Sequence, residues 1–215
     1  MTVAVIADIV GSRLLADRAG AQRAIEHAVA RAESDVPLAT QGLAAVVGDE
    51  LQGEYPRVGE ALAGLLLIRL ALPDGVDCRF GLGVGQVRPL DGGVRRIPEG
   101  PAWWAARDAI EQVERLQQRA APFVRTRVAL AEGEDASMTA TVALANAYAL
   151  SRDQIVSAMT ERTRRLTYGR CLGRSQRELA ADEGITQSAV SQALASAGAA
   201  AVVEGFGALI EGSAS

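Results

Sequence analysis

The sequence predicts an α+β domain over residues 1–134, followed by an all-α domain over residues 135–215. Short apolar runs alternate with amphipathic helical patterns up to about residue 130, whereas from Met138 onward only helical patterns occur. Residues 131–136 between them are rich in glutamate and glycine, which is typical of a domain boundary. With 215 residues, of which 49% are hydrophobic, the chain can hold a main domain with such an appendage.

The first part is expected to contain strand, helix, hairpin, helix, strand, helix and strand, in that order. Strands are placed where apolar residues run together or alternate, and helices where they recur every three or four positions. These patterns cover residues 3–9, 17–34, 39–47 with 50–55, 58–72, 77–87, 101–119 and 123–130. Such an order builds a sheet with helices packed mainly on one face. The stretch 89–98 is polar and Gly-rich and is expected to be a loop.

Two features of this part each allow two interpretations. Gly81, Gly83 and Gly85 alternate along one strand and fall on one face, which lets another backbone or a ligand approach closely. The adjacent Trp103 and Trp104 could be core residues or a base-stacking surface. Core packing is favoured, because tryptophan is chiefly a large apolar side chain.

The second part is expected to form helices over 142–150 and 152–168, and then a helix-turn-helix over about 175–197. Ser175 and Glu178 have the spacing of a capping box at a helix start. Gly184 is expected to end that short helix, and Thr186 to cap the next one. A short helix, a turn with glycine and a second helix are typical of DNA-binding proteins, although an ordinary helical hairpin has the same pattern.

The second of these helices is expected to expose side chains that suit base edges and phosphates, namely Gln187, Ser188, Ser191 and Gln192. Asp182 and Glu183 at the turn repel phosphate, so backbone contacts are expected from Arg174 and Arg177, together with Arg170. All seven arginines after residue 150 lie within 152–177, where acids are few. That basic stretch could meet DNA or could be a solvated helix face.

Two acidic residues at strand ends are candidates for a single site. Asp8 ends the first strand and Asp49 occupies the tip of the hairpin, so the two meet if their strands are neighbours. Two adjoining carboxylates repel one another, and a hard divalent cation between them removes the repulsion. Mg²⁺ or Mn²⁺ held in this way could bind the phosphates of a nucleoside triphosphate. Each aspartate could instead be a simple turn residue.

The motifs of the first part resemble those of the class III nucleotidyl cyclase palm domain, a ferredoxin-like fold. They are Asp8-Ile9 followed by Gly11, the Gly48-Asp49 hairpin, the strand Phe80-Gly81-Leu82-Gly83-Val84-Gly85, and Gly100 before Ala105-Ala106-Arg107. The whole chain, including Asp8-Ile9-Val10-Gly11-Ser12-Arg13 and the C-terminal helix-turn-helix, resembles the bacterial SatD family.

The cyclase resemblance implies roles for several residues. Asp8 and Asp49 would ligate metal with help from the Ile9 carbonyl, and Arg107 would steady the triphosphate in the transition state. The nucleotide-binding segment would include Ile9, Gly11, Ser12 and Arg13. The resemblance also implies a homodimer, whose two-fold symmetry would pair two DNA-reading helices on a palindromic site.

The departures from the cyclase pattern weaken the expectation of turnover. Trp103 stands where cyclases have an asparagine four residues before the arginine, and the purine-reading lysine would fall at Ala45. Loss of one preorganised donor commonly costs about 10²- to 10³-fold in rate. Nucleotide binding with metal is therefore favoured over cyclisation.

Three functions remain as hypotheses. The first is a DNA-binding regulator whose palm domain binds a nucleotide and a divalent metal. The second is an active nucleotidyl cyclase or nucleotidyltransferase, and the third is a vestigial palm domain that serves only for dimerisation. The start of the chain has no signal-peptide pattern, and no run approaches the roughly 18 to 20 apolar residues of a membrane span. We therefore expect a cytoplasmic protein with no membrane partner.

Overall fold

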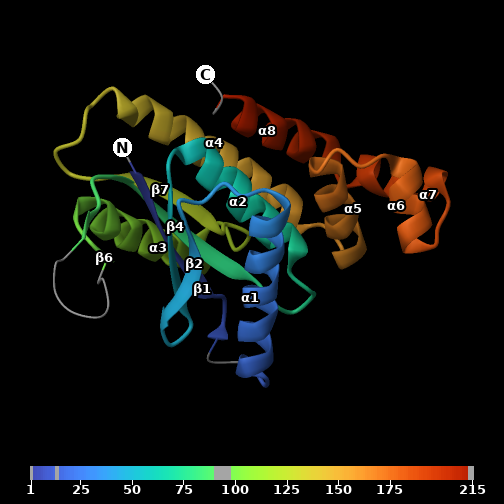
Figure 1. Cartoon of the computed structure of the whole chain (residues 1–215), viewed down its shortest axis with the longest axis horizontal. Helices are drawn as coiled ribbons and strands as arrows, with labels where there is room; N and C mark the ends of the chain where they lie inside the picture. The colour runs from blue at the N-terminus through green and yellow to red at the C-terminus, as the bar shows by residue number, and fades with distance from the viewer. Residues whose placement is uncertain (1, 13–14, 90–97, 213–215) are drawn as a thin grey trace.

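The computed structural model describes residues 2–12, 15–89 and 98–212 (Figure 1). The strands are β1 (Thr2–Ile9), β2 (Gln41–Val47), β3 (Glu50–Tyr55), β4 (Cys78–Gly85), β5 (Arg88–Pro89), β6 (Pro98–Glu99) and β7 (Thr126–Leu130). The helices are α1 (Arg18–Asp35), α2 (Val58–Ala71), α3 (Pro101–Arg119), α4 (Met138–Ser157), α5 (Glu161–Cys171), α6 (Gln176–Glu183), α7 (Gln187–Ser196) and α8 (Ala199–Glu211). The elements expected before residue 131 are all present.

Five strands form one mixed sheet in the order β2-β3-β1-β4-β7. The central strand β1 is antiparallel to both β3 and β4, and β7 is added parallel to β4. The segment from β1 to β4 runs strand-helix-strand-strand-helix-strand with the spatial order β4-β1-β3-β2, which is the ferredoxin-like arrangement. The expected α+β, ferredoxin-like fold is confirmed, with β7 as a fifth strand.

Helices cover both faces of this sheet, because the side chains of β1 alternate between two apolar clusters. Val5 and Ala7 belong to the large core beneath α1 and α2, whereas Ala4 and Ile6 pack with residues of α3. Figure 1 shows α3 on the opposite side of the strands from α1 and α2. The expectation of helices mainly on one face is therefore wrong for α3, whose apolar stripe packs on the second face.

The glycine face of β4 receives the backbone of α3. A Cβ atom on Gly83 would lie 2.5 Å from the amide nitrogen of Ala106, and one on Gly81 would lie 2.5 Å from that of Ile110. Real Cβ atoms do not approach other heavy atoms so closely, so only glycine permits this contact. Of the two interpretations, close approach of a backbone is the one that applies here.

The tryptophan pair divides between core and surface. Trp103 is buried in the cluster beneath α3, as expected, whereas the side chain of Trp104 is 63% exposed. The two short strands β5 and β6 pair with each other at the ends of the expected polar loop, within which residues 90–97 lie outside the described residues.

The helix boundary expected near residue 151 is wrong. Helix α4 continues through Ser151 to Ser157. The hydroxyl of Ser151 donates a hydrogen bond to the carbonyl of Ala147 at 3.2 Å. The break comes before α5, where the Thr160 side chain accepts a hydrogen bond from the amide of Thr163. Helix α8 follows α7 and buries Val202 and Phe206.

The expected helix-turn-helix is present as α6, a turn and α7. The capping box of Ser175 and Glu178 is complete, with both reciprocal hydrogen bonds made. Gly184 ends α6 with a φ of 64°, and the Thr186 side chain caps α7. Within the described residues no single helix is long and apolar enough to cross a membrane, and only α7 and α8 together, bent by 80°, have the length and composition of a span.

Candidate functional site

Asp8 lies at the end of β1 on the side of the sheet that α3 covers, and it forms a two-point ion pair with Arg79 of β4. The strand register sets the two residues opposite each other. The distances are 2.8 Å from Arg79 Nε to Asp8 Oδ1 and 3.0 Å from Arg79 Nη2 to Asp8 Oδ2. Arg79 is largely buried and also pairs with Glu114 of α3 at 3.3 Å. Both oxygens of Asp8 are thus engaged.

Asp49 lies at the tip of the β2–β3 hairpin, where Gly48 has a φ of 65°. Its Oδ1 accepts from Nη2 of Arg18 at 2.8 Å, and the Arg18 side chain is 54% exposed. A hydrogen bond from Ser12 also reaches this carboxylate and is the main reason why the pKa of Asp49 is lowered. Asp49 therefore favours its ionised form and is held by Ser12 and by a half-exposed arginine.

The two aspartates have opposite electrostatic environments. Burial is the main cause of the raised pKa of Asp8, and it outweighs the stabilising effect of Arg79. The negative charge of Asp49 makes a small further contribution in the same direction. This effect of Asp49 is the weakest of the causes, and the pairing of the two carboxylates at one site stays a prediction.

A second two-point ion pair lies beside them, between Glu50 of β3 and Arg107 of α3. The two hydrogen bonds measure 2.6 Å and 2.8 Å. Burial alone would raise the pKa of Glu50, but the hydrogen bonds from Arg107 and Gln52 and the charge of Arg107 together outweigh it, and the pKa is lowered. Arg107, expected to contact a triphosphate, is thus bound to a carboxylate and half exposed.

Two buried polar atoms near these ion pairs have no hydrogen-bond partner among the described residues. They are Oε1 of Gln52 and Nε1 of Trp103. Gln52 is opposite Ile6 in the β1–β3 register, and Trp103 belongs to the same apolar cluster as Ile6. An unpaired acceptor and an unpaired donor in one region are costly unless a ligand or water pairs with them.

The remaining residues of the expected nucleotide segment lie around the β1–α1 turn. The side chain of Ile9 is buried in the large core. Gly11 has a φ of 67°, a backbone conformation that favours glycine, and Ser12 reaches Asp49. Arg13 lies outside the described residues.

Sequence reasoning missed the roles of four residues in this region: Arg18, Glu50, Gln52 and Arg79. Each stands in a strand or at a helix start, where a charged or polar residue is ordinary on a solvated face. A usable signal existed only for Arg79, which is in phase with Gly81 and Gly83 and therefore lies on the same face of β4.

The acids fit a divalent cation only in part. A cation at Asp8 would have to displace the largely buried Arg79 from both carboxylate oxygens. Asp49 would have to release the half-exposed Arg18 and the hydrogen bond from Ser12, neither of which is a buried ion pair. Among residues 2–12, 15–89 and 98–212, no group of three or more His, Cys, Asp or Glu side chains could hold a metal ion. The metal pair stays a prediction, and Asp49 is its better-arranged member.

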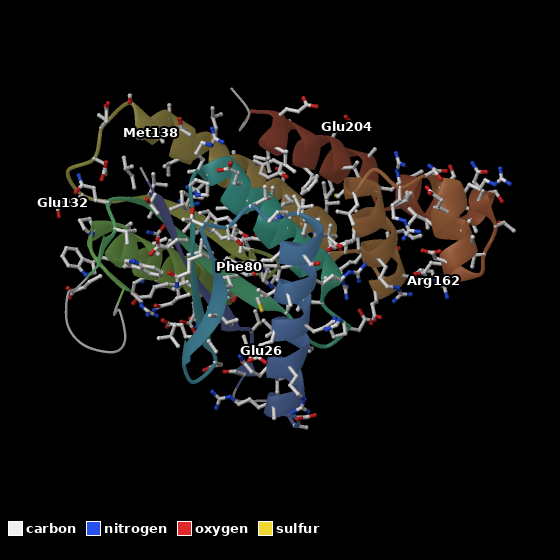
Figure 2. The ribbon with its side chains drawn as sticks, in the orientation of Figure 1. Glu26, Phe80, Glu132, Met138, Arg162 and Glu204 are labelled. Atoms are coloured by element: carbon white, nitrogen blue, oxygen red, sulfur yellow. The ribbon has the colours of Figure 1, made fainter. Side chains whose placement is uncertain are left out.

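The exposed face of α7 carries the expected polar residues at one end of the molecule. Figure 1 shows α6 and α7 at the far end from β6, with Arg162 of α5 labelled nearby in Figure 2. Val190 and Leu194 are buried and hold α7 in place. The solvent-exposed residues of this helix include Gln187, Ser188, Ser191 and Gln192.

The acids of the turn are neutralised within the helical part. Glu183 accepts two hydrogen bonds of 2.8 Å from Arg165, and Asp182 pairs with Arg174. Arg174 is therefore engaged, whereas no ion pair of the exposed Arg177 occurs among the described residues. Arg177 is therefore exposed and can approach a phosphate, whereas Arg170 donates to the carbonyl of Arg174.

Fold and site together define a protein in which a ferredoxin-like sheet, with arginine-paired acids at one end, is joined to a helix-turn-helix. The model of the family described as "SatD family" matches residues 2–203. The chain therefore belongs to the SatD family. No curated protein matches it.

Solved structures that match include adenylyl cyclases. Two structures of a bacterial light-regulated adenylyl cyclase each align with 59% of this chain at 12% identity and a TM-score of 0.44, covering 42% and 74% of those chains. The adenylyl cyclase CyaB from P. aeruginosa aligns with 54% of this chain and 70% of its own, at 12% identity and a TM-score of 0.38. The aligned region thus spans less than half of the first of these chains.

Proposed function

We propose that this protein is a DNA-binding regulator, in which the end of the sheet near Asp49 binds a nucleotide and a divalent cation. The helix-turn-helix carries the DNA part of the proposal. The observation behind it is the capped pair α6 and α7, with a polar α7 face exposed at the end of the molecule. A face of this kind suits the major groove, where glutamine and serine pair with base edges.

The DNA proposal is tested with duplexes selected from a random library by the full chain. Binding is then measured by fluorescence anisotropy for a selected and a scrambled duplex. We expect Gln192→Ala to weaken binding of the selected duplex about tenfold and to leave the scrambled one unchanged, since a base contact discriminates by about 1–3 kcal/mol. Gln118→Ala, an exposed glutamine of α3, is the matched control.

Arg177→Gln tests the phosphate contact separately. It should weaken binding of both duplexes alike and reduce the salt slope by about one, because a phosphate contact carries no base preference. Arg115→Gln on α3 is the control. A chain that enriches no sequence and binds neither duplex would exclude the DNA function.

The nucleotide part of the proposal is supported by the polar groups that converge on the α3 side of the sheet. Asp49 can hold a cation together with nucleotide phosphates, because Mg²⁺ is commonly bound through one or two carboxylates and substrate oxygens. Arg18, once released from Asp49, would lie close to those phosphates. The unpaired Trp103 Nε1 and Gln52 Oε1 offer a donor and an acceptor to a base or ribose.

Thermal unfolding with each nucleoside triphosphate, with and without Mg²⁺ or Mn²⁺, tests this part. We expect a metal-dependent rise in melting temperature that Asp49→Asn removes and that Asp108→Asn, an exposed aspartate of α3, retains. Trp103→Phe keeps an aromatic ring but removes the indole N–H donor, so it should weaken nucleotide binding, whereas Trp104→Phe should not. No stabilisation by any nucleotide would contradict the proposal and favour a dimerisation scaffold.

The same incubations distinguish binding from turnover. The two-point bond of Arg107 to Glu50 leaves the arginine near the acids, which keeps an active nucleotidyl cyclase or nucleotidyltransferase as the second candidate. Cyclic or oligomeric product that is lost in Asp49→Asn would assign that activity.

A further inference from the structure

A cavity of about 310 Å³ lies on the side of the sheet opposite α3, where the α2–β4 turn meets the C-terminal helices. Its walls come from residues 72–77, the segment before β7, the end of α4, and α5. Three arginines line it: Arg69 of α2, Arg125 before β7, and Arg164 of α5. The volume is at the lower end of the range of small-molecule sites.

Arg69 supplies a buried charge to this cavity, with only 3% of its surface exposed. Its guanidinium donates to Asp77, Asp153 and Ser157, at 3.3 Å, 3.1 Å and 2.7 Å. A guanidinium has five N–H donors, so two remain beyond these three bonds.

The other two arginines also have unused donors. Arg125 donates from Nε to Asp77 at 2.6 Å and from Nη1 to two carbonyl oxygens, and among the described residues its Nη2 makes no hydrogen bond. Arg164 donates from Nη2 to Asp74 and to the Leu72 carbonyl, and from Nη1 to the Met159 carbonyl. Its Nε is buried without a partner among the described residues.

The charges around the cavity leave a positive excess. Asp74 and Asp77 are the acids of the lining and face three arginines. Behind the wall, Asp153 is balanced by Arg152 at 2.9 Å. The lining therefore carries one more positive than negative charge, and each of its three guanidinium groups keeps N–H donors beyond the hydrogen bonds named above.

We propose that this cavity binds a phosphate group, either as free phosphate or as the phosphate monoester of a small metabolite. A phosphate dianion presents several acceptor oxygens, so it can accept hydrogen bonds from more than one of the three lining guanidinium groups, which a single carboxylate does less readily. Its charge also offsets the positive excess of the lining. This site is separate from the nucleotide site, which lies on the side of the sheet that α3 covers.

Phosphate bound in this cavity would add contacts between the α2–β4 turn of the sheet domain and α5, which leads to the proposed DNA-binding helices α6 and α7. The turn already contacts α5 through Arg164 and Asp74, at 2.9 Å, and through Glu161, whose carboxylate accepts from the Asp74 amide at 2.9 Å. Arg165, next to Arg164, contacts Glu183 at the end of α6. A bound phosphate would thus stabilise the connection that leads to the helix-turn-helix.

The proposal is tested on the full chain with inorganic phosphate and ribose 5-phosphate as probes, against chloride at equal ionic strength. We expect both thermal unfolding and calorimetric titration to show binding. Arg125→Gln and Arg164→Gln should each weaken it about tenfold or more, because each removes charge-assisted hydrogen bonds. Arg115→Gln, an exposed arginine of α3, should bind as the wild type does.

Two further measurements separate this site from others and from misfolding. Asp49→Asn should keep the response to phosphate, so failure of the nucleotide site would not be mistaken for failure of this one. In the wild-type protein, phosphate should slow amide hydrogen exchange in residues 72–77 and at the start of α5. Binding of ribose 5-phosphate but not inorganic phosphate would assign the site to monoesters. No response to either probe, or an equal response in Arg125→Gln, Arg164→Gln and Arg115→Gln, would overturn the proposal.

Discussion

At the scale of single residues, Asp8 and Asp49 differ more than their similar positions at strand ends suggest. Asp8 is bound at both oxygens by the largely buried Arg79, and burial raises its pKa. Asp49 is bound by the exposed Arg18 and by Ser12, and its pKa is lowered. The distribution of arginines, rather than the acids themselves, decides which carboxylate can take a new partner.

The two aspartates should therefore titrate on opposite sides of 3.8, the ordinary pKa of the residue. NMR titration of the side-chain carboxyl carbons should place the Asp8 midpoint above this value and the Asp49 midpoint below it. A group with a lowered folded pKa stabilises the protein above its unfolded pKa and loses that effect as the pH falls through its folded pKa. Asp49→Asn should accordingly lose less stability on acidification than the wild type. Reversed midpoints would contradict this assignment.

The strand-end pattern predicts Asp8 and Asp49 as one site, and the cyclase resemblance adds Ser12, which makes a hydrogen bond to Asp49. The pairing of Asp8 with Asp49 stays a prediction. Their arginine partners could not be predicted, since Arg79 and Arg18 reach the acids through strand register and the position of α1. Pairing across 71 residues of sequence leaves no local pattern. The same reason hid Glu50 as the partner of Arg107, which lies 57 residues away.

At the scale of elements, the contact between α3 and β4 determines which groups meet at the site. Gly81 and Gly83 let the helix backbone lie directly on the strand. Arg107 and Glu114 are thereby placed beside the start of β3 and the end of β1, and Trp103 packs with Ala4 and Ile6 of β1. A larger residue in β4 would lift α3 and separate Arg107 from Glu50.

Gly83→Ala should destabilise the fold by at least about 1–3 kcal/mol, the usual cost of forcing extra volume into a packed core. The added Cβ would meet the α3 backbone, which cannot rotate away as a side chain can. Urea denaturation measures the free energy of unfolding. The matched control is Gly207→Ala in α8, where no atom lies within 4 Å of the added Cβ and the helix should gain up to about 1 kcal/mol. Equal effects of the two substitutions would contradict the packing argument.

Most elements followed from periodicity, including the capped α6 and α7. The exceptions have physical causes. The two helices expected over 142–150 and 152–168 meet at Ser151, a residue that competes for backbone hydrogen bonds, but its hydroxyl donates to the carbonyl four residues earlier and the helix continues. The second layer of helices on the sheet was missed because a glycine face indicates close approach without identifying the backbone that approaches.

At the scale of the whole molecule, the α+β part and the helices after residue 137 share one apolar core, which includes residues of α2, α4, α5 and α8. Two side chains of α4 also bind the outer edge of β7. Asn146 pairs with both the amide and the carbonyl of Val128 at 2.9 Å, and Asp153 accepts from the amides of Arg125 and Thr126 at 2.7 Å. These side chains therefore occupy backbone hydrogen-bonding groups on the outer edge of β7 that would otherwise be available to a strand of another chain.

Asp153 is the residue that connects these parts most directly, because it is fully buried and also pairs with Arg69 of α2 and Arg152 of α4. Asp153→Asn would keep the shape of the side chain but leave two buried guanidinium groups undercompensated. Removal of one partner from a buried ion pair costs about 3–5 kcal/mol, and we expect a loss of that size in urea denaturation. Asp108→Asn, on the exposed side of α3, should change stability little.

Because the network joins β7, α2 and α4, the wild type should unfold in a single transition. Two results together would contradict this coupling: separate unfolding of the C-terminal helices, and an unchanged stability of the sheet in Asp153→Asn. The two parts would then be independent, and a phosphate bound between them could not influence both.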